Sequence, residues 1–191
     1  DYEKHLKKAN EGSDFTREAI SLASRESHII GDVVENYLKF AKGKKGIVFA
    51  TDIEAAFKIE KEFLAKGVKA KTVTGETPDL ERATAIIDFA EKDLEVLINV
   101  DLFDEGFDVP GIEVVSMARP TMSIGKFLQM IGRALRIIKG KPYALIIDHV
   151  GNIKNHGLPD QRRVWTLDRI VKRRDTTNFI RICSNHLCNA P

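Results

Sequence analysis

The sequence contains little cysteine and no long hydrophobic run. Its only two cysteines, Cys183 and Cys188, both lie in the last nine residues. No disulfide framework can support a core from that position, so we expect a reducing, cytoplasmic environment. The longest stretch without Asp, Glu, Lys or Arg is residues 182–191. A membrane-spanning helix needs about 20 predominantly apolar residues, so we expect no membrane span.

An excess of charge of either sign is also missing. The chain has 30 Lys and Arg against 28 Asp and Glu, a formal net charge of +2. Total charge therefore does not argue for nucleic acid or for an acidic partner, and only local charge can do so. The chain begins at Asp1, with no charged segment followed by an apolar run. We therefore expect no signal peptide, and we expect the chain to be part of a longer protein.

Two motifs are absent as well, and each absence excludes a class of function. No G-x-x-x-x-G-K-[S/T] loop occurs, so the chain alone is not expected to bind a nucleoside triphosphate in the P-loop manner. No G-x-S-x-G turn occurs either, which argues against a serine hydrolase.

Strand-like and helix-like segments alternate along most of the chain. With 43% hydrophobic and 30% charged residues, the composition is that of one globular domain with a sizeable core and a tail. Short β-branched segments predict strands at 46–50, 69–74, 95–100, 112–117 and 143–148. Between them, apolar residues recur every three or four positions, which predicts helices. Their expected buried faces are Ile30, Val33, Tyr37 and Phe40; Ala56, Ile59 and Phe63; Leu80, Ala83, Ile87 and Ala90; and Phe127, Ile131, Ala134 and Ile138. This alternation predicts an α/β fold, an open parallel sheet with helices on both faces.

Two arginines and a glycine stand close together in the segment Gln129-Met130-Ile131-Gly132-Arg133-Ala134-Leu135-Arg136. On a continuous helix Arg133 and Arg136 share one face, with Gln129 one turn earlier. Two guanidinium groups on a rigid element suit a polyphosphate and the charge that develops during phosphoryl transfer. An ordinary amphipathic helix with exposed arginines fits this segment alone equally well.

A second polar segment follows the predicted strand 95–100 at its carboxyl end, where parallel sheets bind ligands. Within residues 99–110, Glu105-Gly106 and Asp108-Val109-Pro110 combine carboxylates with a permissive glycine and a rigid proline. A turn capped by Asp108 is the alternative for this loop alone.

Together these residues resemble the second RecA-like domain of superfamily 2 helicases and translocases. Residues 47–51 look like motif IV, residues 99–110 look like motif V, and residues 129–136 match the motif VI pattern Q-x-x-G-R-x-x-R. Thr74-Gly75 falls where the following strand meets the nucleic-acid backbone in that family. The resemblance covers roughly residues 28–150 and extends to the order of the motifs and their strand or helix context.

The resemblance implies the C-terminal domain of an ATP-dependent DNA helicase or translocase. ATP and Mg²⁺ would lie in a cleft against an N-terminal RecA-like domain that carries the P-loop, so this chain alone would not hydrolyse ATP. By match to motif VI, Arg136 would be the arginine finger that reaches the γ-phosphate, Arg133 its phosphate-side partner and Gln129 a polar contact.

Motif V and the strand ends carry further implied roles. Asp108 would face the ribose or the motif VI helix, and Glu105-Gly106 would couple cleft closure to the nucleic-acid strand. Contacts to the phosphate backbone of DNA would come from Thr74, Gly75, Asn99 and Thr121, without reading its sequence.

A narrower resemblance joins residues 119–123, Arg119-Pro120-Thr121-Met122-Ser123, to residues 148–152 and 156–159. These segments are similar to bacterial and phage DNA repair helicases related to the DEAD/DEAH-box group. In that group the chain often continues into a zinc-ribbon-like cluster, which suits Cys183 and Cys188. Two cysteines are only half of a structural zinc site, so Zn²⁺ is expected only in a longer protein.

We therefore expect a lead-in segment at 1–27, a helicase C-terminal RecA-like domain at 28–160 and a basic tail with the start of a zinc-ribbon segment at 161–191. The tail has seven Arg or Lys against two Asp between Gln161 and Arg181. It predicts phosphate contacts, with a solvated arm as the alternative; the residues concerned are Arg162, Arg163, Lys172, Arg173 and Arg174. Two other functions stay open: a nucleotide-binding doubly wound domain of a transferase, and a non-catalytic nucleic-acid-binding module.

Overall fold

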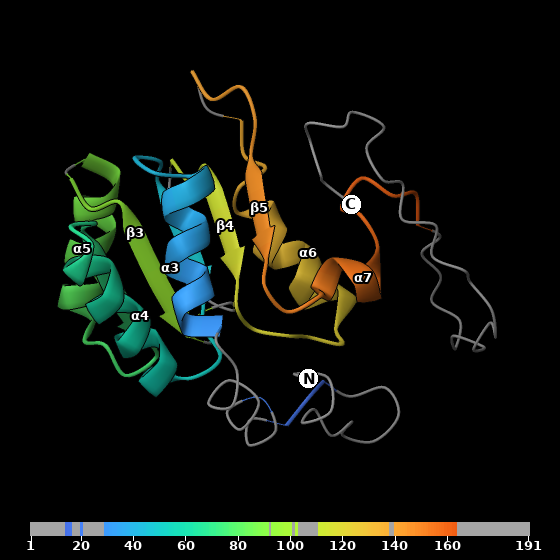
Figure 1. The fold of residues 1–191 in the computed structure, drawn as a ribbon, viewed down its shortest axis with the longest axis horizontal. Helices are drawn as coiled ribbons and strands as arrows, with labels where there is room; N and C mark the ends of the chain where they lie inside the picture. Colours follow the sequence, from blue (N-terminus) through green and yellow to red (C-terminus); the bar gives the residue numbers. More distant parts are fainter. Residues whose placement is uncertain are drawn as a thin grey trace.

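Five parallel strands form a single open sheet. The structure is a computed structural model, and it describes residues 14–16, 20, 29–91, 93–100, 102, 111–137 and 140–163. The sheet order is β2-β3-β1-β4-β5, and every neighbouring pair is parallel (Figure 1). The strands are β1 (Gly46–Phe49), β2 (Ala70–Thr74), β3 (Val96–Val100), β4 (Val114–Met117) and β5 (Leu145–Asp148). The predicted open parallel sheet is confirmed, with strands one to two residues shorter at their starts than the sequence indicated for β2 to β5.

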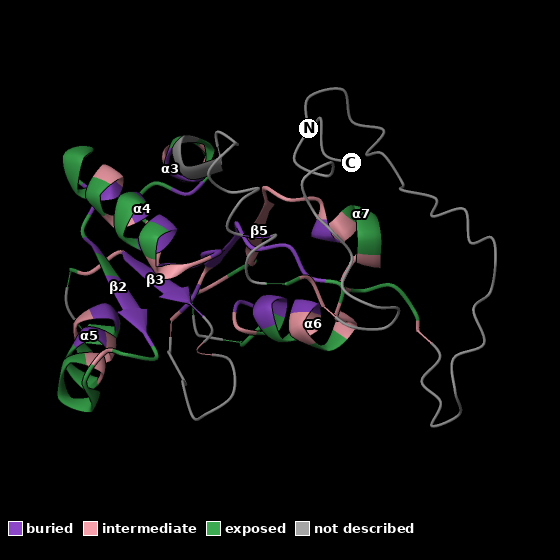
Figure 2. Cartoon of the chain, turned by 90° about the horizontal axis from the view of Figure 1, so that it is seen from below, coloured by how far each residue is buried: buried purple, intermediate pink, exposed green. Residues whose placement is uncertain are grey.

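Helices cover both faces of the sheet, as expected. The elements are α3 (Ile29–Phe40), α4 (Ile53–Ala65), α5 (Asp79–Glu91), α6 (Ile124–Gly132) and α7 (Asn152–His156). The view from below shows α3 and α4 on one side of the sheet and α5 and α6 on the other (Figure 2). Helix α4 starts where it does because the Asp52 carboxylate accepts a hydrogen bond from the Ala55 amide at 2.8 Å. Within the described ranges, no helix is long and apolar enough to cross a membrane.

The core consists of two apolar layers separated by the sheet. Strands β1, β3 and β4 are buried along their whole length, because a parallel sheet covered on both faces leaves no strand face in water. Successive residues therefore alternate between layers: Val48 packs with α3 and α4, whereas Ile47 and Phe49 pack with α5 and α6. This rigid centre fixes the positions of the loops at both ends of the strands.

The predicted buried face of α5 is wrong. Leu80 is 81% exposed and Ile87 49% exposed, while Ala85 and Phe89 are buried. The helix carries two competing apolar stripes, and the one with Phe89 packs on the sheet because burying an aromatic ring removes more apolar surface from water. The predicted face of α4 is confirmed, since Ala56, Ile59 and Phe63 are all buried.

Helix α6 is shorter than the sequence indicated. It ends at Gly132, so Arg136 lies beyond it rather than on one helical face with Arg133. After Gly132 the chain turns tightly, with the amides of Arg133, Ala134 and Leu135 each donating to the carbonyl three residues earlier. Phe127, Ile131 and Ala134 are buried as predicted, and Ile138 lies outside the described residues.

Edge strand β2 has outward-facing amides that are hydrogen-bonded to side chains. The Lys69 carbonyl accepts from Glu95 and Val96 of the β3 segment, so the amides of Thr72 and Thr74 point away from the sheet. The Thr72 amide donates to Glu60 Oε2 of α4 at 2.8 Å, and the Thr74 amide donates to Thr77 Oγ1 at 2.9 Å.

Candidate functional site

The predicted site residues divide between the two edges of the sheet. Thr74 ends β2, Asn99 is the penultimate residue of β3, and Thr121 follows β4, so all three lie at the carboxyl edge. Helix α6 then runs from this edge to the opposite one, where the carbonyl of Ala134 and that of Ile112, just before β4, accept from the same ammonium group of Lys141. The sequence placed the predicted motif V segment at the carboxyl edge and assigned no edge to motif VI. The structure separates the motif VI arginines from the strand-end residues by the length of α6.

The motif VI residues lie on and just after the end of α6. Gln129 and Arg136 are exposed, and Arg133 is half-buried. The helix beneath them is anchored by Phe127, Met130 and Ile131, all buried in the core. The backbone that carries Arg133 and Arg136 is thus held at the amino edge, just after a well-packed helix. Two guanidinium groups so close in the chain suit an anion with several oxygens.

Most of the predicted motif V segment, residues 99–110, lies outside the described residues. Glu105, Gly106 and Asp108 lie outside the described residues. Leu102 within the segment packs against the apolar layer that contains α6, and Ile112, two residues after the segment, is buried in the same layer. The residues on either side of 103–110 therefore belong to the same layer as motif VI.

Asn99 is a buried polar side chain at the carboxyl edge. Its side chain is 2% exposed, and its carbonyl accepts from the Ala50 amide at 3.0 Å. Among the described residues, no donor hydrogen-bonds to its Oδ1. A buried carbonyl oxygen without a donor is costly; it is the Nδ2 group of an asparagine, not this oxygen, that is a donor suited to phosphate oxygens.

Thr74 and Gly75 form a self-contained turn after β2. The Thr74 hydroxyl accepts from the Glu76 amide at 3.2 Å, and the Thr77 amide donates to the Thr74 carbonyl at 3.1 Å. Gly75 is exposed, and a Cβ at its position would meet no other atom. Gly75 therefore leaves its backbone accessible from outside the carboxyl edge.

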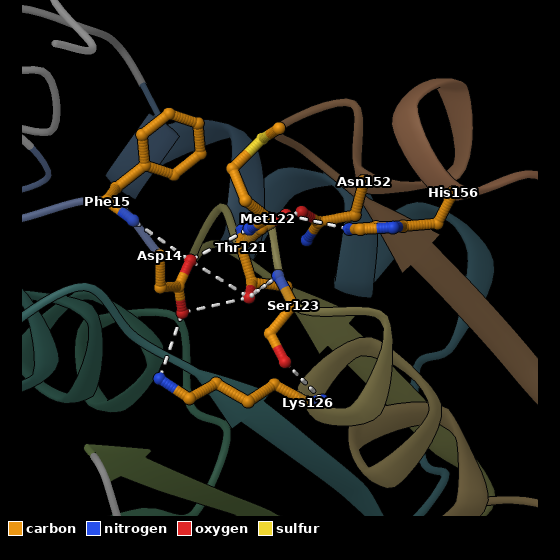
Figure 3. Close-up of polar contacts among 8 residues, drawn as sticks. All are labelled: Asp14, Phe15, Thr121, Met122, Ser123, Lys126, Asn152 and His156. Atoms are coloured by element: carbon orange, nitrogen blue, oxygen red, sulfur yellow. Dashed lines mark hydrogen bonds and ion pairs between the residues drawn. The ribbon is translucent and has the colours of Figure 1, made fainter. Parts of the chain in front are cut away.

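Thr121 is the centre of a hydrogen-bonded cluster (Figure 3). Its hydroxyl donates to both carboxylate oxygens of Asp14 at 3.1 and 3.0 Å and accepts from the Ser123 amide at 3.0 Å. Asp14 also accepts from the Met122 amide at 2.8 Å and from Lys126 Nζ at 2.9 Å. Residues more than 100 positions apart are thus joined at the start of α6, and the Thr121 hydroxyl already has internal partners.

The Asp14 carboxylate is stabilised in its charged form. Burial raises its pKa, but hydrogen bonds from Lys126 and from the Met122 and Phe15 amides, together with the Lys126 charge, lower it further than burial raises it. The net pKa lies below the ordinary value of 3.8. Asp14 therefore binds the β4–α6 loop as a carboxylate at neutral pH.

Asn152 and His156 hold the other side of the same loop, which sequence reasoning did not foresee. Asn152 is fully buried, its Oδ1 accepts from the Thr121 amide, and its Nδ2 donates to the Arg119 carbonyl, both at 2.9 Å. His156 Nε2 donates to the Thr121 carbonyl at 2.8 Å, and its ring stacks on Phe127. The only sequence signal was the similarity of segments 119–123 and 148–159 to one helicase group, without an indication that they touch.

In the described part of the predicted basic tail, two arginines lie in different settings. Arg162 is exposed. Arg163 donates four hydrogen bonds, to the carbonyls of His156, Leu158, Pro159 and Gln161, which uses four of the five donors of a guanidinium group. Lys172, Arg173, Arg174, Cys183 and Cys188 lie outside the described residues. Within the described part of the chain, no three His, Cys, Asp or Glu side chains are grouped as metal ligands.

Two other features lie away from these residues. His149 shares a 2.8 Å hydrogen bond with Ser116, and burial lowers its pKa despite the nearby charges of Asp148 and Asp32. A half-buried neutral histidine of this kind fits a structural role in the sheet. A surface pocket of ≈ 490 Å³ lies between edge strand β2 and α5, lined by Lys71, Leu80 and Asp88 among others.

Comparison with known proteins identifies the family. The helicase conserved C-terminal domain matches residues 30–138. A 51.5 kDa protein of a Lactococcus phage is 43% identical over 152 residues, 80% of this chain and 33% of that protein. The DNA 3'-5' translocase XPB2 of Sulfurisphaera tokodaii is 31% identical over 144 residues, 75% of this chain and 31% of that protein. The chain thus spans about a third of these relatives.

A solved structure shows the same fold. The Escherichia coli DEAD-box protein SrmB matches with a TM-score of 0.55 at 22% identity, over 63% of this chain and 69% of that one. At this identity the likeness concerns the fold alone. The chain belongs to the helicase conserved C-terminal domain family, and its sheet is the RecA-like fold of superfamily 2 helicases.

Proposed function

We propose that this chain is the C-terminal motor domain of an ATP-dependent DNA helicase or translocase. It supplies an arginine finger and part of the nucleic-acid track. The observation that carries the proposal is the placement of Arg136, an exposed arginine within the family match, directly after a helix anchored in the core.

On the ATP side, Arg136 contacts the γ-phosphate, with Arg133 and Gln129 beside it. An arginine that reaches into a cleft stabilises the charge that builds up on the transferred phosphoryl group. The N-terminal RecA-like domain supplies the P-loop and the Mg²⁺ ligands. Glu105, Gly106 and Asp108 keep the coupling roles that the resemblance implies.

On the nucleic-acid side, the carboxyl edge provides Gly75, Asn99 and Thr74. Their amide and hydroxyl groups contact phosphates, which positions a strand without reading its bases. We assign Thr121 to shaping the β4–α6 loop, because its hydroxyl is bonded to Asp14 and Ser123. Charge-driven affinity for phosphates comes from Arg162, Lys172, Arg173 and Arg174. Arg163 instead holds the backbone of residues 156–161 through its four hydrogen bonds.

DNA is the proposed track. The similarity to a DNA translocase and the resemblance of segments 119–123 and 148–159 to DNA repair helicases support it. ATPase activity of the complete protein, measured with single-stranded DNA, duplex DNA or RNA at equal nucleotide concentration, tests this choice. Stimulation by RNA alone would replace DNA with RNA as the track.

The arginine finger is tested by Arg136→Ala in the complete protein. We expect kcat for ATP hydrolysis to fall about 10³-fold, with little change in DNA affinity, because such a residue acts mainly in the transition state. Lys61→Ala is the matched control, since Lys61 is an exposed cation on α4. Steady-state kinetics and fluorescence anisotropy provide the two readouts.

The outcomes separate the proposal from its alternatives. An unchanged kcat in Arg136→Ala removes the arginine finger. A complete protein that binds DNA but does not hydrolyse ATP fits the non-catalytic binding module. ATP-dependent group transfer to a small molecule without any effect of DNA fits the transferase-like domain.

A further inference from the structure

One ammonium group binds three backbone carbonyls from two segments at the amino edge of the sheet. Lys141 Nζ donates to the Ile112 carbonyl at 2.8 Å, to the Arg136 carbonyl at 2.9 Å and to the Ala134 carbonyl. An ammonium group has three N–H donors, so all of them are in use. Burial lowers the pKa of Lys141, and the charge of Glu113 partly offsets this effect.

These three carbonyls belong to the two segments that the proposed function brings together. Ile112 comes two residues after Pro110, the end of the predicted motif V segment, and Ala134 and Arg136 belong to motif VI. Lys141 lies on neither segment but in the loop that leads to β5. It therefore fixes the distance between the exit of one motif and the end of the other.

The hydrogen bond from Lys141 restrains a part of the turn that backbone hydrogen bonds do not reach. Hydrogen bonds from the amides of Arg133, Ala134 and Leu135 hold the turn after α6 as far as Leu135. Lys141 adds a restraint on the backbone of Arg136 itself. A cation at this place is also favoured by the partial negative charge at the carboxyl end of a helix.

We propose that Lys141 is a positioning residue for Arg136: it fixes the Arg136 backbone against the end of the motif V segment, so that the guanidinium group is already placed for the γ-phosphate. This inference rests on the proposed function. Catalytic groups need to be held to within about 0.5 Å of their working position. Misplacement by about 1 Å lowers a rate about 10²-fold.

The test compares Lys141→Met with Lys44→Met in the complete protein. Methionine keeps the length of the side chain and removes the donors. Lys44 is the matched control, because it is a half-buried lysine at the same edge that pairs with Glu113 at 3.3 Å. We expect Lys141→Met to lower kcat about 10²-fold while KM for ATP and DNA affinity change less than about threefold. Lys44→Met should leave kcat close to that of the unchanged protein.

Combining variants distinguishes positioning from general support of the fold. If Lys141 acts through Arg136, adding Lys141→Met to Arg136→Ala causes little further loss of kcat, whereas independent roles make the two losses multiply. Multiplying losses, or equal losses in Lys141→Met and Lys44→Met, overturn the inference. If Lys141→Met does not fold by circular dichroism, Lys141→Leu, which likewise removes all three N–H donors, carries the same comparison.

Failure of this inference differs from failure of the proposed function. If Arg136→Ala loses kcat and Lys141→Met or Lys141→Leu retains it, Lys141 has no positioning role and the arginine finger stands. If Arg136→Ala itself retains kcat, Arg136 is not an arginine finger. Lys141 then has no positioning role either, because that role acts through Arg136.

Discussion

For single residues in this domain, the sequence predicts which polar side chains make important contacts more easily than it predicts their hydrogen-bond partners. Asn99, Thr121 and Arg163 were all expected to contact phosphates. The structure gives Arg163 four backbone carbonyls and gives the Thr121 hydroxyl a carboxylate, while Asn99 Oδ1 has no partner among the described residues. A polar side chain forms hydrogen bonds with whichever groups the fold brings near it. Spacing along the sequence does not predict a contact between residues more than 100 positions apart.

Asp14 provides a prediction at this scale. Asp14→Asn should lower the free energy of unfolding by about 1–2 kcal/mol at pH 7, because it replaces charge-assisted hydrogen bonds from Lys126 and the Met122 amide with weaker ones. The pKa of Asp14 is lowered in the folded state. Its stabilising effect is therefore full above the ordinary pKa and is lost as pH falls through the folded-state value.

Urea unfolding at pH 7 and at successively lower pH checks this expectation. The difference between the original protein and Asp14→Asn should shrink as the pH falls below about 4, where the unfolded carboxyl group takes up its proton. Asp93→Asn is the control, because Asp93 pairs with Lys69 in full contact with water, where screening leaves little net stabilisation. A difference that persists unchanged at low pH would show that the charge of Asp14 does not stabilise the loop.

At the scale of elements, the periodicity of apolar residues predicted which helices and strands exist, but not the buried face or the end of every helix. The strands and the helices α3, α4, α5 and α6 were all expected, since a buried β-branched run or a three-to-four spacing determines each. The buried face of α5 was missed, because Leu80 and Ile87 form a stripe as regular as the one that contains Phe89. The early end of α6 was missed too, because no proline marks it and Gly132 lies in an otherwise continuous apolar pattern.

The face of α5 gives a stability prediction. Phe89→Ala should lower the free energy of unfolding by about 3–5 kcal/mol, because the ring is fully buried with Val73 and Leu97. Leu80→Ala should change it by less than about 0.5 kcal/mol, since that side chain is mostly in water. Thermal and urea unfolding measure both. A larger loss of stability in Leu80→Ala than in Phe89→Ala would mean that α5 buries the face with Leu80, as the sequence suggested.

At the scale of the whole molecule, the candidate groups for ATP and for nucleic acid lie at opposite ends of the strands. The sequence predicted the motifs, but it could not show this separation. The direction of α6 across the sheet, and therefore the position of Arg136, depends on packing between the β4 and α6 residues of one apolar layer. The predicted motif V segment begins at Asn99 near the carboxyl end of β3, and Ile112, two residues after the segment, comes just before the start of β4; its central residues lie outside the described ranges.

This separation predicts that the two functions respond to different substitutions. Gly75→Asp in the complete protein should weaken DNA binding several-fold at low salt and much less at high salt, because an added negative charge at the carboxyl edge repels phosphates and salt screens the repulsion. The glycine has open space around it, so the fold should tolerate the change. ATP hydrolysis at saturating DNA should stay close to normal.

Thr84→Asp is the matched control, since it adds the same charge at an exposed position of α5. Fluorescence anisotropy across a salt series measures both variants. Equal weakening in the two would mean that net charge, rather than the carboxyl edge, determines DNA affinity.

The hydrogen bonds along the outer side of β2 have a consequence for the behaviour of the domain at high concentration. An uncovered edge strand invites another chain to extend the sheet, which leads to aggregation. Here the carboxylate of Glu60 and the hydroxyl of Thr77 already occupy the outward amides of Thr72 and Thr74, so an incoming strand meets a negative charge and bonded donors. Two polar side chains therefore favour a sheet that stops at β2 and copies of the domain that remain separate from one another.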